Sequence, residues 1–329
     1  MEKPMKPTHS GVVSVWKLTP IIAFAIPIII LYHLYPSSFE MTWKGRTYQL
    51  FFIWLLTLET IIGWEALESN GWRVKYLKTL AFLMFSTLPT IYVVMSNYAG
   101  LNDSILNFAL KHRVYFAGMM PLAMEYLVFA ILLTLIVLVN YGVKTLSEYS
   151  ISIFFAGIIG LIYLVDNLYP YGRFIPFQAI VPTTTQLAAN ILNAMNFRTE
   201  ISNKVHPIYG SITELTVKDA QGRYLAGFGV AWPCAGVDSL LLYSVTMLLF
   251  FKKSAFSLRA SVTYFAVGAA ITYLINVLRI VSIFLVTING GDWLRFHDYY
   301  GPLYSVAWIT VYPLIIMGTQ LLWRKIKKF

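Results

Sequence analysis

The chain has very little cysteine, because Cys234 is the only one among its 329 residues. A single cysteine excludes an internal disulfide and any metal site built from several cysteines, so the fold must be held by packing. Charge is scarce as well: 12% of the residues are charged and 58% are hydrophobic. Since a soluble domain has about 25% charged residues, this composition excludes that class and indicates an integral membrane protein.

Acidic residues are scarcer than basic ones: the chain has 15 acidic and 25 basic residues, which gives a net charge of +10. Such an excess is often a mark of nucleic-acid binding. Here, however, the basic residues cluster in short loops between apolar runs, which is typical of membrane orientation signals. We therefore expect no nucleic-acid partner, and no pattern in the chain indicates a cofactor or a metal ion.

Eight apolar runs are each close to the ~20 residues that a transmembrane helix needs. They extend from Leu18 to Tyr35, Tyr48 to Leu67, Thr79 to Tyr98, Met119 to Tyr141, Ser150 to Tyr169, Val237 to Phe251, Ala260 to Ile288 and Leu303 to Trp323. No small-x-small cleavage site follows the first run, so we interpret it as an uncleaved span. The sequence predicts an all-α polytopic membrane protein of about eight transmembrane helices.

Two further segments do not fit this pattern. Phe174 to Met195 is apolar but is interrupted by prolines and a Thr-Gln run, which favours a re-entrant or interfacial segment that lines a protein cavity. Residues 197–231 are polar and rich in Thr, Val, Tyr and Gly, with a turn candidate at 219–222, so they are expected to form one or two short β-hairpins. This is the only sizeable piece expected outside the membrane.

The distribution of basic residues predicts the orientation. If the eight spans alternate and Phe174 to Met195 does not cross, the basic groups fall on one side, which is the cytoplasm by the positive-inside rule. These groups are Lys3, Lys6, Lys17, Arg73, Lys75, Lys78, Lys144, Lys252, Lys253, Arg259 and the tail residues Arg324, Lys325, Lys327 and Lys328. Both termini are then cytoplasmic, and the hairpin region and Cys234 are extracytoplasmic.

Cys234 lies in the sequence Trp-Pro-Cys-Ala-Gly-Val-Asp-Ser, residues 232–239, which opens a long apolar run. Pro233 suits the first position of a helix, and Gly236 leaves room for another backbone or a substrate carbonyl to approach. The free N–H groups and the dipole of a helix start stabilise a thiolate, the nucleophilic form of cysteine. The other interpretation is a buried structural cysteine, which is the commoner fate of a lone cysteine.

Arg279 lies well inside the run from Ala260 to Ile288, and an arginine within a membrane span is a candidate functional group. Small and polar residues recur at helical spacing along this run and predict a stripe that faces the protein interior. They are Gly268, Thr272, Asn276 and Arg279. The alternative is that Arg279 pairs with Asp238 or Asp166 and only locks helices together.

His297 follows in the loop predicted over 289–301, within the sequence His-Asp-Tyr-Tyr-Gly. It is suited to activate a thiol, and Asp298 is a candidate to orient it. A nucleophile, a base and a cation that stabilises an oxyanion make an acyl-transfer site, and the last three spans offer all three groups on one side. The acidic residues in or near spans are expected mostly to be polar packing groups, with one as a candidate for the substrate channel: Glu59, Glu65, Glu125 and Asp166.

Three motifs in this order resemble the exosortase/archaeosortase family: Cys234 in Pro-Cys-Ala-Gly, Arg279 in Asn-x-x-Arg-Ile and His297 in His-x-x-x-Gly. A further segment is similar to the one that precedes the family's extracytoplasmic β region: Phe177-Gln178-x-x-Val181-Pro182, then Thr185 and Leu187-Ala188. The resemblance divides the chain into unspecific spans over 1–118, a core over 119–323 with an insert at 197–231, and a basic tail over 324–329. Bacterial members commonly have Ser where this chain has Ala235, and archaeal members vary at the third position, so Ala235 and His297 together leave the bacterial or archaeal branch open.

The resemblance implies a membrane cysteine transpeptidase that recognises a C-terminal signal made of a short motif, a transmembrane helix and a basic cluster. Such an enzyme cleaves at the motif and joins the new C-terminus to a lipid or other acceptor. Carried over by position, Cys234 is the nucleophile, Arg279 the transition-state cation and His297 the third member, with Asn276, Asp238 and Asp298 in support. The open alternatives are a protease that only hydrolyses and a non-catalytic scaffold or transporter for surface polymers.

Overall fold

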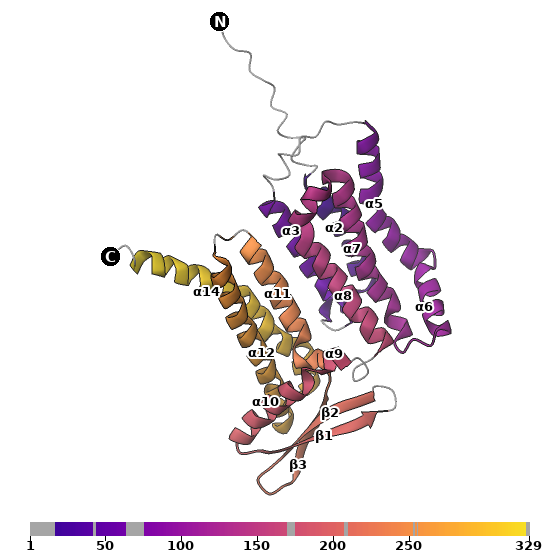
Figure 1. Ribbon diagram of the computed structural model, residues 1–329. Coiled ribbons are helices and arrows are strands. Elements are labelled where there is room, and N and C mark those ends of the chain that lie inside the picture. Colours follow the sequence, from indigo (N-terminus) through magenta and orange to yellow (C-terminus); the bar gives the residue numbers. More distant parts are fainter. Residues whose placement is uncertain are drawn as a thin grey trace. The chain divides into compact units, whose positions relative to one another are not determined.

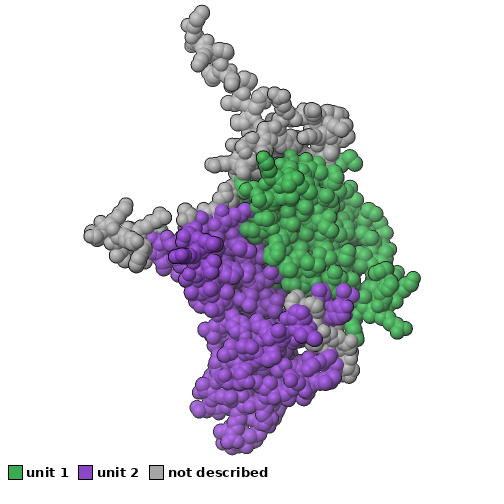
Figure 2. Space-filling model, in the orientation of Figure 1, with its two compact units in different colours: residues 1–164 green, residues 165–329 purple. Residues whose placement is uncertain are grey.

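Each of the eight apolar runs is helical over its described residues (Figure 1). The computed structural model describes residues 17–41, 44–63, 76–169, 175–206, 210–252, 254 and 256–326. Glu65 and the ends of the chain therefore lie outside the described residues. The chain forms two compact units, residues 1–164 and residues 165–329, which are coloured separately in Figure 2. The division predicted at residue 119 rests on sequence resemblance alone and stays a prediction.

The described part of the first unit is built from helices. They are α2 (Thr19–Leu34), η1 (Pro36–Glu40), α3 (Thr47–Ile62), α5 (Tyr76–Tyr98), α6 (Leu101–Lys111), η2 (Ala117–Met119), α7 (Met120–Tyr141), η3 (Val143–Tyr149) and α8 (Ser150–Leu168), which continues into the second unit. The rings of Phe24, Phe52 and Phe129 meet edge to face or tilted, with centroids 5.2 to 6.4 Å apart, and join α2, α3 and α7. These ring contacts contribute van der Waals packing between the three helices.

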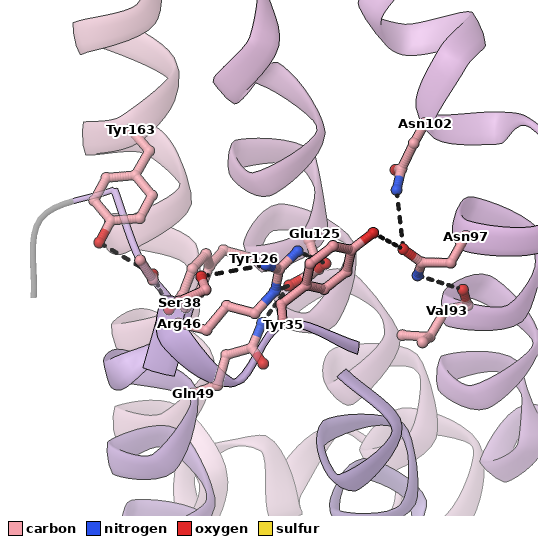
Figure 3. A network of polar contacts seen from close by, with 11 residues as sticks. Tyr35, Ser38, Arg46, Gln49, Val93, Asn97, Asn102, Glu125, Tyr126 and Tyr163 are labelled. Carbon is pink, nitrogen blue, oxygen red and sulfur yellow. Dashed lines mark hydrogen bonds and ion pairs between the residues drawn. The ribbon is translucent and has the colours of Figure 1, made fainter. Parts of the chain in front are cut away.

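A buried polar network in this unit accounts for Glu125 (Figure 3). Arg46 donates from Nε and Nη2 to the two carboxylate oxygens of Glu125 at 2.8 and 2.9 Å, and Gln49 donates to the same carboxylate. Tyr126 donates to the carbonyl of Gly45 at 3.0 Å. A buried carboxylate requires such partners, and the network ties the segment before α3 to α7. The expectation that Glu125 is a polar packing group is confirmed.

Glu59 has a similar structural role at the start of α8. Its carboxylate accepts from the backbone N–H groups of Ile151 and Ser152 at 3.1 and 2.8 Å and from the Ser152 hydroxyl at 2.7 Å. Free N–H groups at a helix start favour an anion, so Glu59 caps α8 from a neighbouring helix. Asp166 is also fully buried, near the end of α8.

The second unit combines helices with a small sheet. Its elements are α9 (Ile175–Gln178), α10 (Val181–Ala194), β1 (Arg198–His206), β2 (Gly210–Lys218), β3 (Tyr224–Val230), η5 (Trp232–Ala235), α11 (Val237–Lys252), α12 (Leu258–Ile288), α13 (Trp293–Arg295), the π-helical turn η6 (Phe296–Tyr300) and α14 (Gly301–Ile326). The three strands are antiparallel in the order β1-β2-β3, with Leu215 opposite both Ile201 and Phe228. The hairpins predicted for 197–231 are confirmed.

The turn predicted at 219–222 joins β2 to β3. Asp219 accepts from the N–H groups of Gln221 and Arg223 at 2.9 and 2.8 Å, and Gly222 has a φ of 83°. Asp and Gly suit this turn because the carboxylate binds local N–H groups and glycine tolerates a positive φ. One face of the sheet, with Leu215 and Val217 fully buried, packs against α10.

The segment Phe174 to Met195 contains two helices, α9 and α10, with a break at residues 179–180. The 14 residues of α10 span about 21 Å at helical rise, less than the roughly 30 Å apolar core, but α11 is only two residues longer, so length alone does not decide which of them crosses. Its buried residues repeat at the spacing of one helix face: Val181, Thr184, Thr185, Ala188, Ala189 and Leu192. This observation agrees with the prediction that the segment does not cross.

Four helices in the described part of the chain are long and apolar enough to cross a membrane: Ala117–Tyr141, Val143–Leu168, Leu258–Ile288 and Trp293–Gln320. Two shorter helices, Thr19–Leu34 and Thr47–Ile61, are also apolar. The chain is thus a multi-pass membrane protein by helix length and composition. The count of about eight crossings stays a prediction.

The predicted loop over 289–301 was wrong in its second half, because the chain is helical from Trp293 onward. Asp292 starts this helix, since its carboxylate accepts from the N–H of Arg295 at 3.0 Å. His297 therefore lies in the turn η6, which leads directly into α14. Helix α6 was also not predicted.

Candidate active site

The cysteine lies between the sheet and α11. Strand β3 ends at Val230, Ala231 is extended, and Pro233 and Cys234 fall within the short 3-10 helix η5. The N–H of Cys234 donates to the carbonyl of Ala231 at 3.0 Å. The thiol is free and half-buried. It is thus at a helix start, as predicted, but this helix is η5, and α11 begins only at Val237.

Gly236 separates η5 from α11 and has a φ of +100°, which favours glycine. A Cβ at this position would lie 2.9 Å from both Cγ and Nδ2 of Asn276 on α12. The close approach that the sequence predicted is therefore made by a side chain. Asn276 donates from Nδ2 to the carbonyl of Cys234 at 2.9 Å, so it fixes the backbone that carries the thiol.

His297 faces the thiol. Its Nε2 lies 3.4 Å from the Sγ of Cys234, within hydrogen-bonding range for sulfur. Its Nδ1 lies 2.7 Å from an oxygen of Asp298. This carboxylate selects the tautomer with a proton on Nδ1, which leaves Nε2 to accept the proton of the thiol. The side chain of His297 is 31% exposed and that of Asp298 is 63% exposed, so the pair is open to solvent on the side of Asp298.

Arg279 contacts the same turn from α12. Its Nη2 donates to the backbone carbonyl of His297 at 2.8 Å. Its Nε is buried and has no hydrogen-bond partner among the described residues, and the same holds for Oδ1 of Asp238. The helix-locking interpretation, in which Arg279 pairs with Asp238 or Asp166, stays an alternative, because a guanidinium that binds the His297 carbonyl has further donors. The charge of Arg279 acts on the Cys234 thiol, and its Nε is an unused donor of the kind that stabilises an oxyanion.

The electrostatic balance at the thiol lowers its pKa. Burial raises the pKa of Cys234, but the hydrogen bond from His297 and the positive charges of His297 and Arg279 lower it further than burial raises it. The net pKa of Cys234 is below that of an ordinary cysteine. A lowered pKa in a partly exposed position is characteristic of a reactive cysteine.

The predicted stripe on α12 is confirmed for its first three members, since Gly268, Thr272 and Asn276 are buried. The structure thus brings together five predicted site residues, Cys234, Arg279, His297, Asn276 and Asp298, whereas Asp238 forms no hydrogen bond through its buried Oδ1.

Sequence reasoning missed two hydroxyl groups beside the cysteine. Thr184 on α10 lies 2.8 Å from the hydroxyl of Tyr273 on α12 and 3.5 Å from the carbonyl of Ala235. The Thr-Gln run at 183–186 was a signal for Thr184, and no motif marked Tyr273. Within the described residues, no three His, Cys, Asp or Glu side chains lie close enough together to hold a metal ion.

A comparison with protein families agrees with this site. A family model described as transmembrane exosortase matches residues 43–314, well over half of the chain. The matched region includes the cysteine, the arginine and the histidine. No curated protein and no solved structure matches the chain.

Proposed function

Because the chain belongs to the transmembrane exosortase family, we propose that it is a membrane cysteine transpeptidase that sorts proteins to the cell surface. The observation that supports this proposal best is the 3.4 Å contact between Sγ of Cys234 and Nε2 of His297, with Arg279 bound to the same histidine. A thiol paired with an oriented base is the arrangement of covalent acyl-transfer catalysis. The substrates are membrane proteins whose C-terminal signal consists of a short motif, a transmembrane helix and a basic cluster.

The first step is acylation. The Cys234 thiolate attacks the carbonyl carbon of the scissile peptide bond, and the negative charge that develops on the oxygen is stabilised by the Arg279 guanidinium. The C–N bond then breaks, and the protonated His297 gives its proton to the leaving amine. The products are a thioester on Cys234 and the released C-terminal helix with its basic tail.

The second step transfers the acyl group. A nucleophilic group of a lipid or another acceptor attacks the thioester, gives its proton to the neutral His297, and releases the Cys234 thiolate. Transfer and hydrolysis differ only in the nucleophile. The mass of the mature substrate separates them, because transfer adds the mass of the acceptor and hydrolysis adds only water.

The orientation follows the basic residues. We place the sheet and Cys234 on the extracytoplasmic side and both termini in the cytoplasm, since this arrangement puts the basic loops inside. A substrate whose basic tail is retained in the cytoplasm then presents its motif to the thiol at the extracytoplasmic face of the membrane.

The direct test is to trap the thioester. Wild-type enzyme incubated with substrate should carry a hydroxylamine-sensitive adduct at Cys234, and Cys234→Ala and Cys234→Ser should carry none. Cys234→Ala should abolish cleavage while the protein remains folded and inserted, because only a sulfur atom is removed. If Cys234→Ala still matures its substrates in cells without another family member, cysteine catalysis is wrong and the scaffold interpretation takes its place.

A further inference from the structure

The position of Arg279 depends on a residue without a side chain. Gly301 is buried at the junction of η6 and α14. A Cβ at this position would lie 2.5 Å from Nε of Arg279 and 3.1 Å from its Cδ. Non-bonded heavy atoms prefer about 3.5–4.0 Å, so even a methyl group would push the arginine side chain away.

The turn that precedes Gly301 explains why the arginine lies so close to the backbone. The N–H of Gly301 donates to the carbonyl of Phe296, five residues earlier, in a π-helical turn. Such turns are rare and occur often at functional sites. Within this turn His297 directs its ring to Cys234 and its carbonyl to Nη2 of Arg279. The guanidinium therefore lies across the turn, and its side chain passes over Gly301.

We propose that Gly301 is a positioning residue for Arg279: the missing side chain gives the arginine the space in which Nη2 reaches the His297 carbonyl and Nε stays without a hydrogen-bond partner. Gly301 touches no reacting atom. It acts through Arg279, and its effect on turnover, though not its effect on the arginine, rests on the proposed transpeptidase function.

The test compares two Gly→Ala variants in the same helix. In Gly301→Ala the new methyl group meets Arg279, whereas a Cβ at Gly318 of α14 has no heavy atom within 4 Å. Alanine has the higher helix propensity, so neither change weakens the helix itself. We expect Gly301→Ala to reduce turnover about 100- to 1,000-fold, the usual effect of losing an oxyanion donor, with little change in KM. Gly318→Ala should leave turnover unchanged.

A second measurement does not depend on any substrate. Cys234 is the only cysteine, so its alkylation rate against pH reports its ionisation without interference. The charged or titratable groups that act on the thiol are His297 on η6, which binds Asp298, and Arg279 on α12. Displacing the guanidinium removes part of the positive charge, so Gly301→Ala should move the midpoint of alkylation to higher pH. Gly318→Ala should leave the midpoint in place.

A double variant separates the clash with Arg279 from other effects of the methyl group, such as its 3.1 Å distance to the Phe296 carbonyl. In an Arg279→Ala background the clash has no partner, so adding Gly301→Ala should not move the alkylation midpoint further. An additional shift of the same size as in the wild type would overturn the proposal, as would an unchanged midpoint in Gly301→Ala alone.

If Gly301→Ala alone fails to insert, the double variant still decides. Recovery of a monodisperse protein in Arg279→Ala/Gly301→Ala supports the clash, and continued failure overturns it. Because the alkylation readout needs no substrate, a failed transpeptidase assay with the expected midpoint shifts contradicts only the proposed function.

Discussion

At the scale of single residues, the candidate site works by a balance of opposing effects on one thiol. Burial alone would keep Cys234 protonated, and only the hydrogen bond and positive charge of His297, together with Arg279, reverse this effect. The thiolate is thus favoured only while its partners are in place. A lone buried cysteine without these partners would be inert, as in the alternative interpretation of Cys234 as a buried structural cysteine.

The first prediction follows from this balance. Wild-type Cys234 should be half alkylated at a lower pH than an ordinary cysteine, because its pKa is lowered. In His297→Ala, burial remains while the hydrogen bond and the charge of the histidine are lost, so the pKa and the alkylation midpoint should rise. Iodoacetamide labelling followed by mass spectrometry from pH 5 to pH 10 would measure both midpoints.

The control for this prediction is His112→Ala, which removes an exposed histidine at the end of α6 in the first unit. It should leave the midpoint where the wild type has it. A His297→Ala midpoint equal to that of the wild type would show that the 3.4 Å contact has no electrostatic consequence.

The resemblance of short motifs identified Cys234, Arg279 and His297, but their contacts could not be derived from the sequence. The thiol of Cys234 contacts a histidine that lies 63 residues later in the chain. The backbone carbonyl of Cys234 accepts a hydrogen bond from an asparagine that lies 42 residues later. Such distances between positions in the chain leave the pairing to tertiary packing. The role of Gly301 was missed for the same reason, since it depends on where the Arg279 side chain runs.

At the scale of elements, long apolar runs predicted the helices because hydrophobic length is a strong signal. The signal fails where polar residues interrupt the run. Helix α6 has exposed polar residues among its apolar ones, and α13 and η6 come after a Gly-Gly-Asp sequence that is typical of a loop. There the cap at Asp292 and the contacts of His297 with Cys234 favour a helix over the local preference for a loop.

The short link between η5 and α11 provides the second prediction. Gly236→Ala places a methyl group in a positive-φ conformation and 2.9 Å from the Asn276 side chain, so it should both destabilise the protein and displace the Cys234 carbonyl. We expect the free energy of unfolding to fall by about 1–3 kcal/mol from the backbone strain alone. Turnover per folded molecule should fall as well, because the nucleophile moves.

Gly290→Ala is the matched control. Gly290 has a φ of +73° in the same unit, but a Cβ there meets no heavy atom within 4 Å. It should lose stability with normal turnover per folded molecule. If Gly236→Ala behaves in the same way in thermal unfolding and in single-turnover cleavage, the contact with Asn276 does not position the nucleophile.

At the scale of the whole molecule, the membrane topology is predicted by the sequence, whereas the lengths of the helices do not determine it. In the part of the chain that the structure describes, four helices meet the length and hydropathy of a span, while α11 has only 16 residues, about 24 Å of helix. The basic residues, rather than the helix lengths, carry the argument for eight crossings. The possible topologies differ in whether an odd or an even number of crossings separates two positions in the chain. Finding the side of the membrane on which each of two positions lies therefore distinguishes them.

The last prediction tests this parity with two probe cysteines in a Cys234→Ala background. Gln221 is exposed in the turn between β2 and β3, and Leu258 is 80% exposed at the start of α12. Between them lies α11, so one crossing there places them on opposite sides. In intact cells a membrane-impermeant maleimide should label Gln221→Cys, whereas Leu258→Cys should be labelled only after lysis. If both positions are labelled in intact cells, α11 does not cross. If only Leu258→Cys is labelled, the orientation is reversed, and the thiol would face the cytoplasm with the sheet beside it.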